Sequence, residues 1–294
     1  MLLPKFDYHE PATLGEACQV MGDLGQKTKA LAGGTDLIVN MKKKILSPAC
    51  LVYLGRIKEM KKIDSSNGLF KIGAGLTAAE VAEMEEIKNN YSALSRGASC
   101  LGSPLIRNLA TIAGNLVSAR PAADFPPPLM AYGARVVLKS SSGERVVSLD
   151  DFFKGPGQTL IAPEEILTEI VLDKLRPFSG AGYIKLGTRQ TLEISLVNVA
   201  AFVSLDGPDG VIKTARIVLG AVGPVPLRAP SGEKALIGEK PSEALLAKAG
   251  EAAAFDSKPI DDYRGSAEYR RAMVDVLTRR ALNEAINAAR SNLN

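Results

Sequence analysis

Side chains that bind metal ions or carry histidine-based catalysis are scarce in this sequence. His9 is the only histidine among 294 residues, which excludes metal sites built on several histidines. A histidine-based catalytic triad would have to use His9. The three cysteines, Cys18, Cys50 and Cys100, are far apart and form no CxxC motif. They are too few for an all-cysteine iron–sulfur cluster or zinc site, and their odd number argues against a disulfide framework. We therefore expect no metal site in this chain and interpret the cysteines as buried small hydrophobic residues.

Long hydrophobic runs and a strong charge imbalance are also missing. No stretch approaches the roughly 18 apolar residues of a membrane-spanning helix. The first residues, MLLPKFDYHEP, lack the charged leader, apolar core and cleavage site of a signal peptide, so a cytoplasmic location is expected. Lys and Arg outnumber Asp and Glu by only 36 to 32, an excess too small and dispersed to favour a nucleic-acid partner. The basic triplet at 42–44 is interpreted as the solvated end of a helix rather than as a phosphate-attracting patch.

The composition is that of an ordinary soluble globular protein. Hydrophobic residues make up 46% and charged residues 23% of the chain. At roughly 100–200 residues per domain, the chain has room for two domains, or three small ones, with a sizeable core. Predicted strands and helices are segregated rather than strictly alternating, so the expected fold class is α+β.

Periodicity and turn residues place the expected elements. Thr13 and Glu16 have the spacing of a capping box and begin an amphipathic helix, and Thr77 and Glu80 begin another. β-Branched runs around short turns predict hairpins at 134–149 and at 197–222. Further strands are expected at 29–32, 51–54, 69–75 and 164–172, and further helices at 91–101, 242–254 and 266–289.

The segment LAGGTDLIV (31–39) is the first candidate binding site. Its two glycines follow a strand and let the backbone approach an anion closely, while Thr35 offers a hydroxyl group. The helix that follows offers free N–H groups, so the turn can cradle a pyrophosphate. A tight turn with no ligand explains the same residues, and both interpretations stay open at this point.

The segment ATIAGNLVSARPAADFPPPL (110–129) is the second candidate. Gly114 and Asn115 permit a left-handed turn, and the prolines stiffen the path of the chain. Hydrogen-bonding side chains gather between apolar runs, namely Thr111, Asn115, Ser118 and Asp124. This pattern suggests a ligand-lining loop, with a surface loop as the alternative.

A third candidate is the G-x-G-x-x-A pattern from Gly73 to Ala78, which fits the dinucleotide-binding fingerprint between a strand and a helix. That motif requires a second parallel strand and an acidic residue about 20 positions on. Residues 91–101 read as a helix instead, so a structural glycine turn is the favoured interpretation. Lys185, in the strand-like segment GYIKLGTR (182–189), would point toward either solvent or a ligand.

Five segments, taken in order, resemble the FAD-binding medium subunits of the xanthine dehydrogenase and carbon monoxide dehydrogenase family of molybdenum hydroxylases. AGGTDL (32–37) is similar to the family's first flavin loop, and residues 102–138 are similar to its second, longer loop. EEILTEI (164–170), GYIKLGTR (182–189) and residues 261–282 follow at suitable spacing. The similarity covers nearly the whole chain, and the order of the segments makes it specific.

The resemblance implies a fold and a set of cofactor contacts. The expected fold has two FAD-binding subdomains of the PCMH/vanillyl-alcohol-oxidase-like type, 1–57 and 58–175, and a C-terminal α+β domain of the CO dehydrogenase flavoprotein type, 176–294. The first loop would contact the pyrophosphate of FAD, the second the ribityl–phosphate region, and Leu167 and Lys185 would lie near the isoalloxazine ring. The cofactor-binding residues expected on this basis are Leu31, Ala32, Gly33, Gly34, Thr35, Asp36, Leu37, Thr111, Gly114, Asn115, Ser118, Ala123, Asp124, Leu167 and Lys185. No residue need act as a catalytic acid or base.

The resemblance also implies partners. A large subunit with a molybdenum cofactor and a small subunit with [2Fe-2S] clusters would deliver electrons to FAD in this chain. An external acceptor such as NAD, a quinone or another carrier would then be reduced. The expected assembly is a hetero-oligomeric oxidoreductase, while a stand-alone flavin reductase on a related fold and a flavin-free scaffold subunit are the alternatives.

Two residues depart from the family pattern. Ala113 stands where the second loop usually has the first of two glycines, and its methyl group is tolerated if the residue keeps a negative φ. Ala113 is the only sequence support for the scaffold alternative. Glu193 stands where the family often has aspartate. The extra four-cysteine cluster of the hydroxybenzoyl-CoA reductase type is excluded, because the chain has three scattered cysteines.

Overall fold

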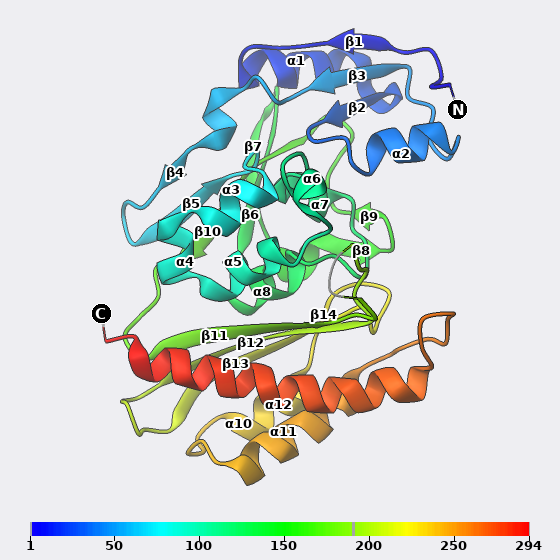
Figure 1. The fold of residues 1–294 in the computed structure, drawn as a ribbon. Coiled ribbons are helices and arrows are strands. Elements are labelled where there is room, and N and C mark those ends of the chain that lie inside the picture. Colours follow the sequence, from blue (N-terminus) through cyan, green and yellow to red (C-terminus); the bar gives the residue numbers. More distant parts are fainter. Residues whose placement is uncertain (1, 190–191, 294) are drawn as a thin grey trace.

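The structure is a computed structural model that describes residues 2–189 and 192–293 (Figure 1). The chain builds three layers in sequence order, each with its own sheet. A small N-terminal unit lies at the top of Figure 1, a five-stranded sheet with short helices lies in the middle, and a four-stranded sheet backed by long helices lies at the bottom. This arrangement confirms the predicted α+β class.

The N-terminal unit is a parallel three-stranded sheet with two helices. Helix α1 (Leu14–Leu24) begins where predicted, because the Thr13 hydroxyl accepts a hydrogen bond from the Glu16 N–H at 3.2 Å. Its buried residues, Leu14, Ala17, Cys18 and Met21, recur at helical spacing and face the sheet. The sheet has the order β1-β3-β2, with β1 (Asp7–His9), β2 (Thr28–Leu31) and β3 (Cys50–Tyr53). The short helix η1 (Gly25–Lys27) precedes β2, and α2 (Leu37–Lys42) lies between β2 and β3.

The middle unit is an antiparallel sheet of order β4-β5-β10-β6-β7. Alternate side chains along its strands, such as Phe70 and Ile72 or Val136 and Leu138, are buried against the helices, as the strand period of two requires. The predicted hairpin at 134–149 is confirmed. The bounds are η2 (Lys58–Lys61), β4 (Ile63–Asp64), β5 (Leu69–Gly73), α3 (Ala78–Glu83), α4 (Glu85–Asn90), α5 (Ser92–Ser99), β6 (Arg135–Ser140), β7 (Gly143–Ser148), α9 (Leu149–Phe152), β8 (Phe153–Gly155), β9 (Gln158–Thr159) and β10 (Ile166–Asp173).

Residues 110–129, for which the sequence suggested a loop, are partly helical, and three short helices lie in and beside this segment. These are α6 (Pro104–Arg107), α7 (Ile112–Val117) and α8 (Pro126–Ala131). Ser103 and Thr111 cap the first two, and proline occupies the first turn of α6 and α8, where its missing N–H costs nothing. Each helix has six residues or fewer, so none is long enough to display the 3.6-residue period by which a sequence reveals a helix.

The C-terminal unit is an antiparallel sheet of order β11-β12-β13-β14 between two helical layers. Helix α8 packs on one face, and the long helix α12 packs on the other, along β11 and β12 (Figure 1). Helix α12 can approach β11 closely because Gly182 has no side chain. A Cβ at this position would lie only 2.4 Å from the Ala281 carbonyl oxygen. The bounds are β11 (Ser179–Leu186), β12 (Val197–Leu205), β13 (Ile212–Gly220), β14 (Leu227–Arg228), α10 (Pro230–Leu236), α11 (Glu243–Asp256) and α12 (Ala267–Ser291).

Candidate functional site

A cavity of about 980 Å³ lies between the N-terminal and middle units. It is lined by the first two candidate segments, although they are separated by more than seventy positions in the chain, and by Ala74, Gly75 and Thr77 of the third. The predicted cofactor-binding residues that line it are Leu31, Ala32, Gly33, Gly34, Thr35, Asp36, Leu37, Thr111, Gly114, Asn115, Ser118 and Leu167. Its position between two subdomains and its mixed polar and apolar lining are typical of a cofactor site.

The first segment forms the predicted turn between β2 and α2. Gly34 has φ +70°, a left-handed conformation that favours glycine, and its carbonyl accepts the N–H of Ile38 at 3.0 Å. Within the part of the chain that the structure describes, the N–H groups of Thr35, Asp36 and Leu37 bond to no protein acceptor. Free amides at the cavity wall are the donors that a phosphate group needs, so the turn fits an anionic ligand.

Gly33 brings this turn into contact with the second segment. A Cβ at Gly33 would lie 1.8 Å from the Leu109 carbonyl oxygen, so only glycine fits there. Helix α7 follows directly and is capped by Thr111, whose hydroxyl accepts the Gly114 N–H at 3.0 Å. The close approach explains how two distant segments come to line one cavity.

Ala113 avoids the positive φ at which its methyl group would not be tolerated. It lies inside α7 and is not among the residues with positive φ. Its N–H donates to the Ala74 carbonyl at 3.2 Å, and the neighbouring Ile112 N–H donates to Leu76 at 2.9 Å. The extra methyl group is therefore accommodated without backbone strain, and Ala113 lines the cavity.

Gly73 and Gly75 form a structural turn, as the favoured interpretation held. Both neighbours of β5, β4 and β10, are antiparallel, whereas the dinucleotide fingerprint needs a parallel β-α-β unit. The Gly75 N–H donates to the Met60 carbonyl at 2.7 Å, and a Cβ at Gly73 would lie 2.4 Å from the same oxygen. These glycines are thus required by the packing of residues 58–62 against the strand end.

Three of the predicted site residues, Ala123, Asp124 and Lys185, lie behind the cavity wall rather than on it. Asp124 and Lys185 form a buried ion pair at 2.9 Å, and the Lys185 ammonium also donates to the Cys100 carbonyl at 3.0 Å. Leu101, the next residue, lines the cavity. The pair therefore supports the wall from the side of the C-terminal sheet.

Tyr183 and Ser195 complete this buried cluster, and sequence reasoning missed both. The Tyr183 hydroxyl donates to Asp124 at 2.9 Å, and the Ser195 hydroxyl donates to it at 3.2 Å. Burial raises the pKa of Asp124, while Lys185 and the two hydroxyl groups oppose that rise. Tyr183 stands two residues before Lys185 on β11, so the strand period of two was the signal that could have found it.

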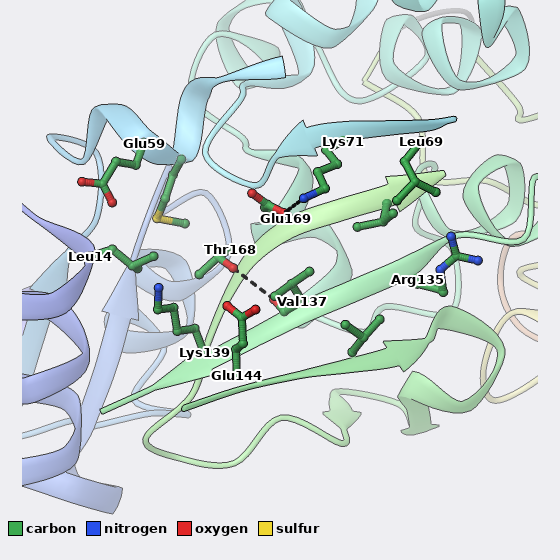
Figure 2. Close-up of a pocket in the computed structure, with 13 residues that line it drawn as sticks. Leu14, Glu59, Leu69, Lys71, Arg135, Val137, Lys139, Glu144, Thr168 and Glu169 are labelled. Atoms are coloured by element: carbon green, nitrogen blue, oxygen red, sulfur yellow. Dashed lines mark hydrogen bonds and ion pairs between the residues drawn. The ribbon is translucent and has the colours of Figure 1, made fainter. Parts of the chain in front are cut away.

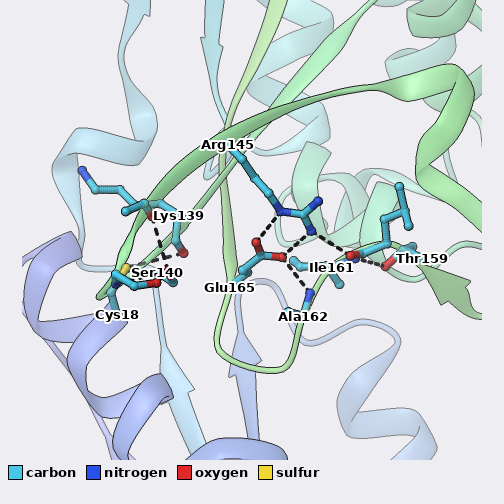
Figure 3. Close-up of polar contacts among 11 residues, drawn as sticks. Cys18, Lys139, Ser140, Arg145, Thr159, Ile161, Ala162 and Glu165 are labelled. Atoms are coloured by element: carbon cyan, nitrogen blue, oxygen red, sulfur yellow. Dashed lines mark hydrogen bonds and ion pairs between the residues drawn. The ribbon is translucent and has the colours of Figure 1, made fainter.

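Arg145 of β7 and Glu165 of the loop between β9 and β10 form a second charged pair (Figure 3). Arg145 donates to both carboxylate oxygens of Glu165, at 2.6 and 2.8 Å, and to the Leu160 carbonyl at 2.9 Å. The Ala162 N–H donates to Glu165 at 2.7 Å. Glu165 lines the cavity, so Arg145 both neutralises its charge and fixes the loop that carries it.

Replacing Glu165 with glutamine is expected to reduce stability by about 1 kcal/mol at neutral pH, because Arg145 is half exposed and screened by solvent. The hydrogen bond from Arg145 is the largest cause that lowers the pKa of Glu165 below 4.5. A carboxyl group whose pKa is lower in the folded than in the unfolded protein stabilises the folded state at pH values above its unfolded-state pKa. This stabilisation is lost as the pH falls through the folded-state pKa. The difference between wild type and Glu165→Gln in urea unfolding should therefore shrink below about pH 4.5; a difference that stays constant would contradict the assignment.

Cys18 also appears in Figure 3, where its thiol donates to the Lys139 carbonyl at 3.7 Å. Burial raises the pKa of this thiol, so it stays protonated and unreactive. Cys50 is likewise buried, whereas Cys100 is only half-buried, so the prediction of burial is confirmed for two of the cysteines. No cluster of metal-ligating side chains occurs among residues 2–189 and 192–293. In the same part of the chain, no helix is both long and apolar enough to cross a membrane.

A smaller cavity of about 470 Å³ lies on the face of the middle sheet that points away from its helices (Figure 2). On its wall the Lys71 ammonium lies 3.8 Å from a carboxylate oxygen of Glu169 on the neighbouring strand. The Thr168 hydroxyl donates to the Val137 carbonyl at 3.4 Å. None of the three candidate segments lines this cavity. The larger cavity is therefore the better candidate for the functional site.

Comparisons with known proteins agree with this site. Residues 4–174 match the family described as the FAD binding domain in molybdopterin dehydrogenase, and residues 182–285 match the CO dehydrogenase flavoprotein C-terminal domain. The chain is 32% identical to the carbon monoxide dehydrogenase medium chain of Hydrogenophaga pseudoflava over 97% of this chain and 98% of that one. It is equally similar, at 32%, to the glyceraldehyde dehydrogenase medium chain of Sulfolobus acidocaldarius, over 97% and 99%.

The structural comparison gives the same answer. A solved carbon monoxide dehydrogenase from Hydrogenophaga pseudoflava, which lacks the Mo-pyranopterin moiety of its cofactor, superimposes with a TM-score of 0.93 at 32% identity. The superposition covers 98% of this chain and 99% of that one. The predicted resemblance is confirmed: the chain belongs to the FAD-binding medium subunits of the carbon monoxide dehydrogenase and xanthine dehydrogenase family of molybdenum hydroxylases.

Proposed function

We propose that the large cavity binds FAD across the two N-terminal subdomains, 1–57 and 58–175, while residues 176–294 form a supporting domain. The observation that carries this proposal is the single cavity shared by the glycine turn at 33–36 and helix α7. Free amides at the turn suit the pyrophosphate, and Thr111, Asn115 and Ser118 suit the ribityl–phosphate region. Leu167 lies on the wall where the isoalloxazine ring is expected.

Ala123, Asp124 and Lys185 would act from behind the wall. Their cluster fixes the turn that follows α7, because the Asn115 side chain on the wall accepts the N–H of Phe125 at 3.4 Å. Leu101 is held in the same way through the Cys100 carbonyl. These residues would therefore set the shape of the cavity, and a place for Lys185 beside the isoalloxazine ring stays a prediction.

FAD, when bound, supplies a redox carrier between iron–sulfur clusters of a small partner subunit and an external acceptor such as NAD, a quinone or another carrier. This chain would bind the cofactor, orient it and limit the access of water. The substrate would be oxidised at the molybdenum cofactor of a large partner subunit. Support for these partners comes from the family, whose named members include medium chains of such dehydrogenases.

The first test is an absorption spectrum of the purified full-length chain, before and after addition of FAD. We expect the bands of oxidised flavin, and we expect them to bleach on reduction with dithionite. Riboflavin in place of FAD tests whether the adenosine diphosphate part is required. A chain that stays colourless after reconstitution would contradict the proposal, provided that its circular dichroism shows a folded protein.

A second test separates the subunit from a stand-alone reductase. Expression of the tagged chain in its native host should co-purify one larger and one smaller subunit that contain molybdenum and iron. A chain that purifies alone and turns over a simple substrate would instead support the stand-alone flavin reductase.

A further inference from the structure

Arg120 belongs to the second candidate segment and contacts Asp36 of the first, and both residues line the cavity. Arg120 follows Ala119, a non-glycine residue with φ +45°, which ends α7 by donating its N–H to the Leu116 carbonyl at 3.0 Å. The Ala119 carbonyl accepts the Gly157 N–H at 3.0 Å, so the unusual conformation is held from both sides. A left-handed residue costs about 1 kcal/mol or more in the backbone, and here it turns the chain so that Arg120 faces helix α2.

Arg120 is held there only loosely. Its Nε lies 3.5 Å from a carboxylate oxygen of Asp36, and its Nη2 lies 3.5 Å from the side-chain oxygen of Asn40. A well-formed contact between guanidinium and carboxylate measures roughly 2.7–2.9 Å. The side chain is half exposed, at 53%, and lines the cavity. Its donors are therefore available to a stronger acceptor.

Among the described residues, three cations line the cavity, Lys29, Lys61 and Arg120, and Arg120 is the one that forms an ion pair with the glycine turn. Asp36 at the end of that turn is its direct partner. The other acidic residue of the lining, Glu165, is already neutralised by Arg145. Lys61, a further cation of the lining, lies 4.0 Å from Glu80. A doubly charged diphosphate at the turn would thus find free amides on one side and Arg120 on the other.

We propose that Arg120 is a positioning residue that closes over the diphosphate group of the cofactor, exchanging its long contact with Asp36 for a bidentate contact with phosphate oxygens. The inference rests on the proposed FAD function and deepens it. Arginine suits this task because its planar donors match two phosphate oxygens at once. Since Arg120 stands in the second segment and the turn stands in the first, the diphosphate would join the two subdomains through this side chain.

The test compares three ligands on the deflavinated full-length chain by calorimetry. FAD and ADP carry the diphosphate, whereas riboflavin carries the ring without it. Arg120→Gln is expected to weaken FAD and ADP roughly tenfold and riboflavin less than twofold, as for the loss of one charged hydrogen bond at a half-exposed site. Arg120→Lys should lie between the two, and the salt dependence of FAD binding should decrease in Arg120→Gln.

Arg96→Gln is the matched control. Arg96 has the same exposed fraction, 53%, and forms an ion pair with Glu284 at 2.9 Å, but it does not line the cavity. We expect its FAD affinity to equal that of wild type. Equal losses for FAD and riboflavin in Arg120→Gln, or an equal loss in Lys61→Gln, would overturn the inference.

The outcomes also separate this inference from the proposed function. If wild type binds FAD and Arg120→Gln binds it equally well, the role of Arg120 is refuted and the FAD site stands. If wild type binds neither FAD nor ADP while folded, the FAD site itself is refuted, and the role of Arg120 with it.

Discussion

A Gly33→Ala protein is expected to lose FAD binding, with an affinity at least roughly a hundredfold below that of wild type, which corresponds to about 3 kcal/mol. The new Cβ would lie 1.8 Å from the carbonyl oxygen of Leu109 and 2.5 Å from its carbon. Both are backbone atoms, so no side-chain rotation can relieve the contact. The glycine turn must therefore separate from residues 109–111, and the cavity that the two segments share must open.

The measurement is a fluorescence titration of the folded variant with FAD, beside a thermal melt. Gly15→Ala is the control, because among the described residues a Cβ at that position would meet no atom within 4 Å beyond its chain neighbours and the backbone of its own helix. Gly15 lies in α1, where alanine is favoured over glycine, so this variant should bind FAD normally and melt at the same or a higher temperature. Normal FAD binding by Gly33→Ala would mean that the contact at Leu109 does not shape the binding site.

The glycine turn could be predicted from sequence because its determinants are local. Two glycines after a strand and a threonine before a helix specify a tight turn with free amides, whatever the rest of the fold does. The hairpin at 134–149 and the capped helix at Thr77 were predictable for the same reason. Glycine is also required at position 33 because the backbone of Leu109 lies against it, and no local sequence pattern reveals this distant contact.

The parts that sequence reasoning missed depend on distant residues. The short helices α6 and α7 begin at side-chain caps, Ser103 and Thr111, whereas α8 has no such cap and is buried against the C-terminal sheet. None of the three is long enough to be stable on its own. Asp124 and Lys185 were both predicted near the flavin, but their pairing behind the wall joins residues 61 positions apart. No sequence pattern pointed to Arg120, and only the fold places it against Asp36.

Replacing Lys185 with methionine is expected to be the most destabilising single change in the site. The side chains of Lys185 and Asp124 are only 9% and 8% exposed, so the variant leaves a buried carboxylate without its charged partner. Breaking such a pair from one side costs roughly 3–5 kcal/mol. Lys71→Met is the control, because its partner Glu169 lies 3.8 Å away and both side chains are about 40% exposed. We expect that variant to lose less than about 1 kcal/mol in urea unfolding.

The pH dependence of the Lys185→Met penalty distinguishes a stranded charge from lost packing. Burial already raises the pKa of Asp124 above 3.8, and removing Lys185 removes the largest influence that opposes this rise. A carboxyl group with a raised folded-state pKa favours folding more as pH falls toward its unfolded-state value, and the penalty is complete above the folded-state pKa. The loss of stability should therefore be smaller at about pH 5 than at about pH 8, and the double variant with Asp124→Asn should recover part of it. A penalty that is equal at both pH values and unchanged in the double variant would show that Lys185 matters for packing alone, and that the cluster behind the cavity wall is not held by charge.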